Sequence, residues 1–156
     1  MILVVSDTSA VRCLVYLRKL ELLGYMFSKV YVPPAVVTEL ERVGAWAPAK
    51  MFLTQQSPSA SGRQLSMCDD LDPGETEAIQ LAMELQASYL IIDESRGREV
   101  AARLKIPTMG VLGVLLRAKD AGHVDQIMPL IDQLRHGLGF YISDALYVRV
   151  RQLAGE

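Results

Sequence analysis

The sequence lacks several features that mark common classes of protein. Its two cysteines, Cys13 and Cys68, belong to no CxxC or Cys/His group, which excludes a cysteine-based metal or redox motif. We expect Cys13 to be a buried apolar residue and Cys68 an incidental thiol. No apolar run is long enough to cross a bilayer, and the first residues lack the basic flank of a signal peptide. These absences favour a cytoplasmic protein.

An excess of positive charge is also missing. The 16 Lys and Arg residues are opposed by 18 Asp and Glu residues, so the formal net charge is −2. Overall charge therefore does not indicate a nucleic-acid partner, although a local basic face could still bind phosphates. No internal repeat is present, and 156 residues that are 51% hydrophobic can bury one core. We expect a single domain over residues 1–156.

Segments typical of strands and helices alternate along the chain. Apolar runs at residues 2–6, 30–32 and 89–92 lack polar alternation, as in parallel strands that are covered on both faces. Residues 106–109 include Pro107 and suit a short edge strand. Helical spacing or capping signals predict helices at 8–24 (capped by Thr8 or Ser9), 34–42, 73–86, 96–104, 111–121, 123–134 and 143–153. The pattern predicts an α/β protein with a mainly parallel sheet and additional C-terminal helices.

Periodicity fades between residues 44 and 70, where only residues 52–54 suggest a strand. A connection of this length inside a compact domain is often a lid or a binding loop. Trp46 and Phe52 lie in this segment and could stack on nucleic-acid bases or pack in the core or in a dimer interface.

Four acidic residues follow strands or lie near helix starts. Asp7 and Asp93 each end an apolar strand, and in open α/β sheets ligands bind beyond the carboxyl ends of the strands. Glu39 and Glu75 lie on helices that can point to the same edge. Carboxylates that meet there repel one another unless a cation separates them, and oxygen-only ligands favour Mg²⁺ or Mn²⁺ over zinc. Such a site can activate water to hydrolyse a phosphodiester.

Simpler interpretations exist for each acid. Asp7 could cap the following helix, Glu39 could be a solvent-exposed helix residue, and Glu75 forms a capping-box pattern with Asp72. Two nearby acids are either surface charges or accessory groups of the site, namely Glu77 and Glu94.

Basic residues follow the fourth acid. Arg96, Arg98, Arg103 and Lys105 could hold an RNA backbone beside the acids, whereas a solvated helix face is the simpler interpretation.

The order of these motifs resembles that of PIN-domain proteins, which include toxin ribonucleases. The chain contains Val-Val-Ser-Asp7-Thr-Ser9, Val32-Pro-Pro-Ala-Val-Val-Thr-Glu39-Leu, Leu-Asp-Pro-Gly-Glu75-Thr-Glu77 and Leu-Ile-Ile-Asp93-Glu94. The later segments Arg98-Glu-Val-Ala101 and Thr108-Met-Gly110 resemble, more narrowly, the DUF3368 branch.

The resemblance implies a three-layer α/β/α fold with a metal-dependent ribonuclease centre, often in the toxin of a toxin–antitoxin pair. Asp7, Glu39, Glu75 and Asp93 then take the four acidic positions, and Ser9 a polar position beside the metal. The third position, usually Asp in these nucleases, is Glu75 here, and Glu77 competes for the role.

Three functions compete at this point. The first is an Mg²⁺- or Mn²⁺-dependent endoribonuclease that forms a homodimer or a higher homo-oligomer through its C-terminal helices. An antitoxin partner is implied by the resemblance. The second is a PIN-like nucleic-acid-binding or regulatory protein with little or no turnover. A phosphohydrolase of the haloacid-dehalogenase type is disfavoured, because it needs an Asp at position 9, which is Ser9.

Overall fold

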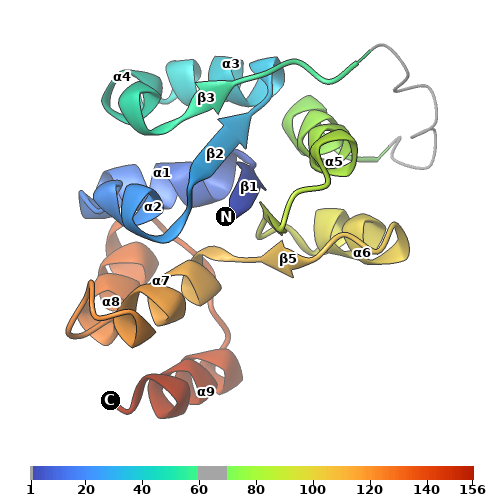
Figure 1. Ribbon diagram of the computed structural model, residues 1–156. Coiled ribbons are helices and arrows are strands. Elements are labelled where there is room, and N and C mark those ends of the chain that lie inside the picture. Colours follow the sequence, from blue (N-terminus) through green and yellow to red (C-terminus); the bar gives the residue numbers. More distant parts are fainter. Residues whose placement is uncertain (1, 60–69) are drawn as a thin grey trace.

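The described residues form one sheet of five parallel strands, and helices surround it (Figure 1). The structure, a computed structural model, describes residues 2–59 and 70–156, so Cys68 lies outside the described residues. The strand order is β3-β2-β1-β4-β5, and every neighbouring pair is parallel. The strands are β1 (Leu3–Ser6), β2 (Lys29–Val32), β3 (Thr54–Gln55), β4 (Tyr89–Ile91) and β5 (Thr108–Met109). The predicted parallel sheet with an edge strand near Pro107 is confirmed.

Both faces of the sheet are covered by helices, because the central strands are apolar on both sides. Val4 and Ile91 pack into one cluster, whereas Val5 and Leu90 pack into the other. The first cluster is completed by α1 (Thr8–Leu17), α2 (Glu21–Met26), α3 (Pro34–Arg42), α4 (Trp46–Ala49), α7 (Val111–Asp120), α8 (Met128–Gly137) and α9 (Asp144–Ala154). The second is completed by α5 (Pro73–Leu85) and α6 (Ser95–Arg103). The predicted three-layer α/β/α architecture is therefore confirmed.

Two expectations about the first half of the chain were wrong. The helix predicted over residues 8–24 is divided, because Arg18 adopts a left-handed conformation with φ 57° and ends α1. The segment expected to be irregular from residue 44 contains α4 and a 3₁₀ turn, Lys50–Phe52, and its strand is β3 rather than residues 52–54. Trp46 and Phe52 pack partly buried against the larger core cluster, which agrees with the core interpretation.

The helix predicted from residue 123 begins later, at Met128. Its first N–H groups are satisfied by the last residue of the chain. The carboxylate of Glu156 accepts hydrogen bonds from Ile127 N (2.9 Å) and Met128 N (3.1 Å), and it forms an ion pair with Lys119 (2.8 Å). A negative group at this place also interacts favourably with the helix dipole. In the described part of the chain, no helix has the length and apolarity needed to cross a membrane.

Candidate active site

The candidate site lies where the strand order reverses. From β1 the chain builds β2 and β3 on one side and then β4 and β5 on the other, so the carboxyl ends of β1 and β4 flank the crevice at which ligands bind in such sheets. Asp7 directly follows β1, and its N–H donates to Ile91 O at the end of β4 (3.0 Å). Asp93 lies two residues beyond β4. The topology therefore brings these two acids to one place.

Asp7 both caps a helix and lies among other acids. Its Oδ1 accepts a hydrogen bond from Ser9 N (3.1 Å), so Asp7, and not Thr8 or Ser9 as predicted, is the N-cap of α1. The side chain is buried, and burial followed by repulsion from Asp93 and Glu75 raises its pKa well above its usual range. A buried carboxylate beside two others is costly when charged, and it becomes favourable when a cation lies next to it.

Asp93 has one satisfied oxygen and one unsatisfied oxygen. Its Oδ1 accepts from Val111 N (3.1 Å) at the start of α7. Its Oδ2 is buried and has no hydrogen-bond partner among residues 2–59 and 70–156. Burial raises the pKa of Asp93, while the Val111 hydrogen bond and the charge of Arg98 oppose the rise. A buried acceptor without a partner costs about 1–3 kcal/mol, so Oδ2 is an atom that a cation would stabilise.

Glu75 and Glu39 are the other two candidates. Glu75 lies in the first turn of α5, where its N–H donates to Asp72 Oδ1 (2.7 Å) as the capping pattern predicts. Burial, then the hydrogen bond to Asp72 and its charge, then Glu94 and Glu39, raise the pKa of Glu75 to about 8. Glu39 on α3 accepts a hydrogen bond from the Thr8 hydroxyl. Electrostatic repulsion thus links Glu39 to Glu75 and Glu75 to Asp7.

Glycines allow three of these carboxylates to approach the backbone closely. A Cβ atom at Gly74 would lie 2.6 Å from Glu39 Oε1, and one at Gly110 would lie 2.6 Å from Asp93 Oδ1. A Cβ atom at Gly97 would lie 3.1 Å from the Glu75 carboxylate and 2.5 Å from Ile92 Cδ1. Sequence reasoning did not find this role, and its signal is a glycine at or near the start of each of the helices α5, α6 and α7.

The donor set is suited to a hard divalent cation. All four side chains offer oxygen, which Mg²⁺ and Mn²⁺ prefer, and Asp93 offers an unsatisfied buried atom. However, within the described ranges no three His, Cys, Asp or Glu side chains are close enough together to hold an ion as they lie. Asp7, Asp93 and Glu39 each direct an oxygen to a hydrogen bond of their own. The acids are therefore neighbours whose side chains would have to turn toward a shared ion.

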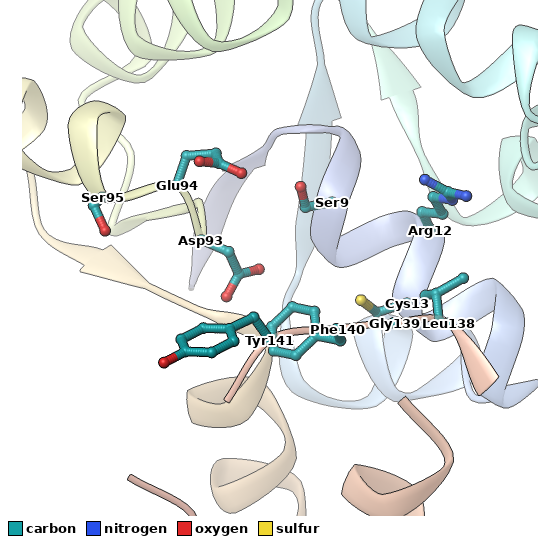
Figure 2. Close-up of a pocket in the computed structure, with 10 residues that line it drawn as sticks. All are labelled: Ser9, Arg12, Cys13, Asp93, Glu94, Ser95, Leu138, Gly139, Phe140 and Tyr141. Atoms are coloured by element: carbon teal, nitrogen blue, oxygen red, sulfur yellow. The ribbon is translucent and has the colours of Figure 1, made fainter. Parts of the chain in front are cut away.

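The accessory acids have different surroundings. Glu77 is engaged in a contact of its own, because its Oε1 accepts from Ala35 N (3.0 Å) and ties α5 to α3. This contact gives Glu77 a structural role and leaves Glu75 as the neighbour of Asp7. Glu94 is exposed and precedes α6, and together with Ser9 it lines a cavity of about 440 Å³ that Asp93 also lines (Figure 2).

The predicted basic stretch is divided between two ends of α6. Arg96 is paired with Asp70 (2.6 Å) and Glu99 (3.0 Å), and the charge of Arg98 acts on Asp93. Arg103 ends α6 and Lys105 follows it, near the amino end of β5. Because α6 returns from the carboxyl to the amino edge of the sheet, Arg103 and Lys105 lie away from the acids. Of the four predicted basic residues, Arg96 and Arg98 therefore remain as candidates for an RNA contact beside the acids.

Three lining residues were missed by sequence reasoning. Arg12 on α1, and Phe140 and Tyr141 between α8 and α9, line the cavity that Asp93 borders. Figure 2 shows the two aromatic rings along one side of the cavity, below Asp93. In the sequence, Phe140 and Tyr141 are a pair of adjacent aromatic residues between two predicted helices. Their position at the cavity depends on contacts between distant segments, which the sequence pattern does not report.

Comparisons with known proteins agree with the fold and the topology. A family model described as DUF3368, a PIN domain, matches residues 3–156. No curated protein gives a significant match. Among solved structures, the chain resembles a PilT N-terminus domain protein from the hyperthermophilic archaeon Sulfolobus solfataricus P2. That similarity has a TM-score of 0.55 and 18% sequence identity, and it covers 80% of this chain and 96% of the archaeal chain.

Proposed function

Since the chain belongs to the PIN-domain family, whose members are typically nucleases, we propose that it is a metal-dependent endoribonuclease. Asp7, Glu39, Glu75 and Asp93 are its proposed ligands for Mg²⁺ or Mn²⁺. PIN domains in general use divalent metals. The bound ion would activate a water molecule and stabilise the charge that develops during hydrolysis of an RNA phosphodiester. Ser9 and Glu94 line the adjacent cavity as accessory groups.

The observation that carries the proposal is the buried, unsatisfied Oδ2 of Asp93 beside the buried Asp7. The Asp93 side chain is positioned by Val111 N, and the Asp7 side chain by Ser9 N, so neither group depends on an ion for its place. Both side chains have raised pKa values because of burial, and Asp7 also because of its acidic neighbours. A cation would hold both groups in the charged state needed for ligation.

Cleavage of a labelled single-stranded RNA with Mn²⁺ or Mg²⁺ tests the proposal. We expect Asp7→Asn and Asp93→Asn each to lower kcat/KM by at least about 100-fold, more than the 10–100-fold typical of a group that only supports a ligand. Both changes keep the shape of the side chain and its hydrogen-bonding oxygen. Glu77→Gln is the matched control, since Glu77 is bonded to Ala35 N, and it should cleave like wild type. Wild-type cleavage by both Asn variants would disprove the assignment.

A second candidate is a PIN-like nucleic-acid-binding or regulatory protein with weak or no nuclease activity. It is favoured by the side-chain arrangement, because in the described residues the acids do not form a group ready to hold an ion. The contact between Glu75 and Asp72 also engages the third acid elsewhere. Calorimetric titration with Mn²⁺, run beside the cleavage assay, separates the two functions. Binding of metal or RNA without cleavage supports this candidate.

We further propose that the nuclease is the toxin of a toxin–antitoxin pair and that it forms a homodimer. Exposed apolar side chains on the C-terminal helix, among them Leu146 and Leu153, support self-association. Induced expression in a bacterial host should stop growth with the wild-type chain and not with Asp7→Asn. Light scattering on the purified protein measures the number of subunits.

A further inference from the structure

The cavity beside Asp93 combines polar and aromatic walls. Its volume is about 440 Å³, within the roughly 300–1,000 Å³ of small-ligand sites. Ser9, Asp93 and Ser95 line one part, while Phe140 and Tyr141 line another. A larger, more apolar groove also includes Asp93, Phe140 and Tyr141. The two rings therefore line two adjoining cavities that Asp93 also lines.

The segment that carries these rings is anchored on both sides. Phe140 N donates to Leu134 O of α8 (2.9 Å), Ile142 is buried, and the Ser143 hydroxyl accepts from Leu146 N to cap α9. Tyr141 lies between these anchors and is 86% exposed. The backbone on either side of Tyr141 is held in place, so its exposed ring can reach a flat partner without a rearrangement of the main chain.

Positive charge lies across the cavity from the rings. Arg12 lines the cavity from α1, and within residues 2–59 and 70–156 it takes part in no ion pair. Figure 2 shows its guanidinium on the side of the cavity opposite Tyr141. A ligand that spans this space meets a cation at one end and aromatic faces at the other. A nucleotide, with a charged phosphate and a flat base, has this chemistry.

We propose that this cavity binds one unpaired nucleotide of the RNA strand, with its base stacked on Tyr141 and Phe140 and a flanking phosphate against Arg12. The proposal rests on the ribonuclease function proposed above and assigns the residues that hold the unpaired strand beside Asp93. A base in a duplex is paired and stacked on its neighbours, so it does not present a free face to a protein ring. Stacking accepts any base, so this contact selects unpaired strands without selecting a sequence.

Binding can be measured apart from cleavage by placing each change in the Asp7→Asn protein. Fluorescence anisotropy with Mg²⁺ compares a fluorescein-labelled oligouridylate of about 12 nucleotides with the same strand annealed to oligoadenylate. We expect Tyr141→Ala to weaken single-strand binding about tenfold, and Tyr141→Phe by less than about twofold, because stacking needs the ring and not the hydroxyl. Arg12→Gln should reduce the slope of log affinity against log salt by about one.

Tyr25→Ala is the matched control. Tyr25 is also an exposed tyrosine (62%), but it lies before β2, at the amino edge of the sheet, where it stacks on His123. It should bind the single strand as the parent does. In the active protein, Tyr141→Ala should raise KM much more than it lowers kcat, because stacking acts on the bound substrate before and during the reaction alike.

The inference is overturned if Tyr141→Ala binds the single strand as tightly as its parent. It is also overturned if the duplex binds equally well with the same dependence on Tyr141. A change in the number of subunits without a change in RNA affinity would make this a self-association surface, and that result too would overturn it. Tyr141-dependent binding by a wild-type chain that never cleaves RNA would refute only the nuclease function. Cleavage that is indifferent to Tyr141 would refute only the stacking site.

Discussion

Replacement of Gly110 by alanine tests whether the glycine beside Asp93 sets the position of that carboxylate. Gly110 has φ −91° and ψ 177°, values that alanine adopts without strain, so the substitution acts mainly through the added methyl group. That methyl group would lie 2.6 Å from Asp93 Oδ1 and 3.3 Å from Arg98 Nη1. Since ordinary van der Waals contact begins near 3.4 Å, the carboxylate must move by about 0.8 Å.

The expected effect on activity is larger than the effect on stability. A displacement near 1 Å in a reacting geometry costs about 100-fold in rate, so we expect Gly110→Ala to lose about 30–100-fold in kcat/KM and to bind Mn²⁺ more weakly. The hydrogen bond from Val111 N to Asp93 Oδ1 would be stretched, which lowers the free energy of unfolding by about 1 kcal/mol.

Gly113→Ala is the control on the same helix. Its methyl group would meet only the side chain of Met109, which is flexible and can move away. It should cleave RNA and bind Mn²⁺ like wild type. Calorimetry with Mn²⁺ and initial cleavage rates provide both readouts. Wild-type kinetics and metal affinity in Gly110→Ala would refute the reasoning, because the carboxylate would then tolerate the displacement.

Two further predictions concern stability. The metal-free protein should lose about 3 kcal/mol of its free energy of unfolding between pH 5 and pH 8, measured by urea unfolding, because folding raises the pKa of Glu75 to about 8 and also raises that of Asp7. A group whose pKa is raised by folding stabilises the fold while protonated and loses this contribution as pH rises. Glu75→Gln should flatten the dependence, and an unchanged profile in that variant would contradict the assignment. Glu156→Ala should lower the free energy of unfolding by about 1–2 kcal/mol, because Ile127 N and Met128 N lose their acceptor. Unfolding at the same urea concentration as wild type would show that water replaces the carboxylate at no cost.

The parts of the fold that local patterns determine could be predicted from the sequence. Apolar runs that end at Asp7 and Asp93 identified the central strands, and Asp72 followed by Pro73 identified the start of α5. The break after α1 could not be predicted, because a helix end in the left-handed conformation is usually marked by glycine and here is formed by Arg18. Its N–H and that of Lys19 close the helix through Val15 O and Leu14 O.

The candidate site was likewise only partly predictable from the sequence. The order and context of the four acids could be inferred from motifs, since topology alone brings the strand ends together. The contacts of Tyr141 and Arg12 with one cavity depend on how α1 packs near the segment between α8 and α9, and no local pattern reports that packing. The different roles of Glu75 and Glu77 likewise depend on which of them meets Ala35 on another helix.

The Asp7 side chain meets two separate requirements, the start of α1 and the charge of the proposed metal site. One oxygen starts α1 by accepting from Ser9 N, and this duty is met equally well by asparagine, serine or threonine. The negative charge is needed only for the proposed binding of a metal ion. A relative that has lost its chemistry can therefore retain a well-formed helix with asparagine at this position, so an intact fold there does not report an active protein. Conversely, an alanine at position 7 would weaken the helix as well as the site, and its inactivity could not be assigned to either cause.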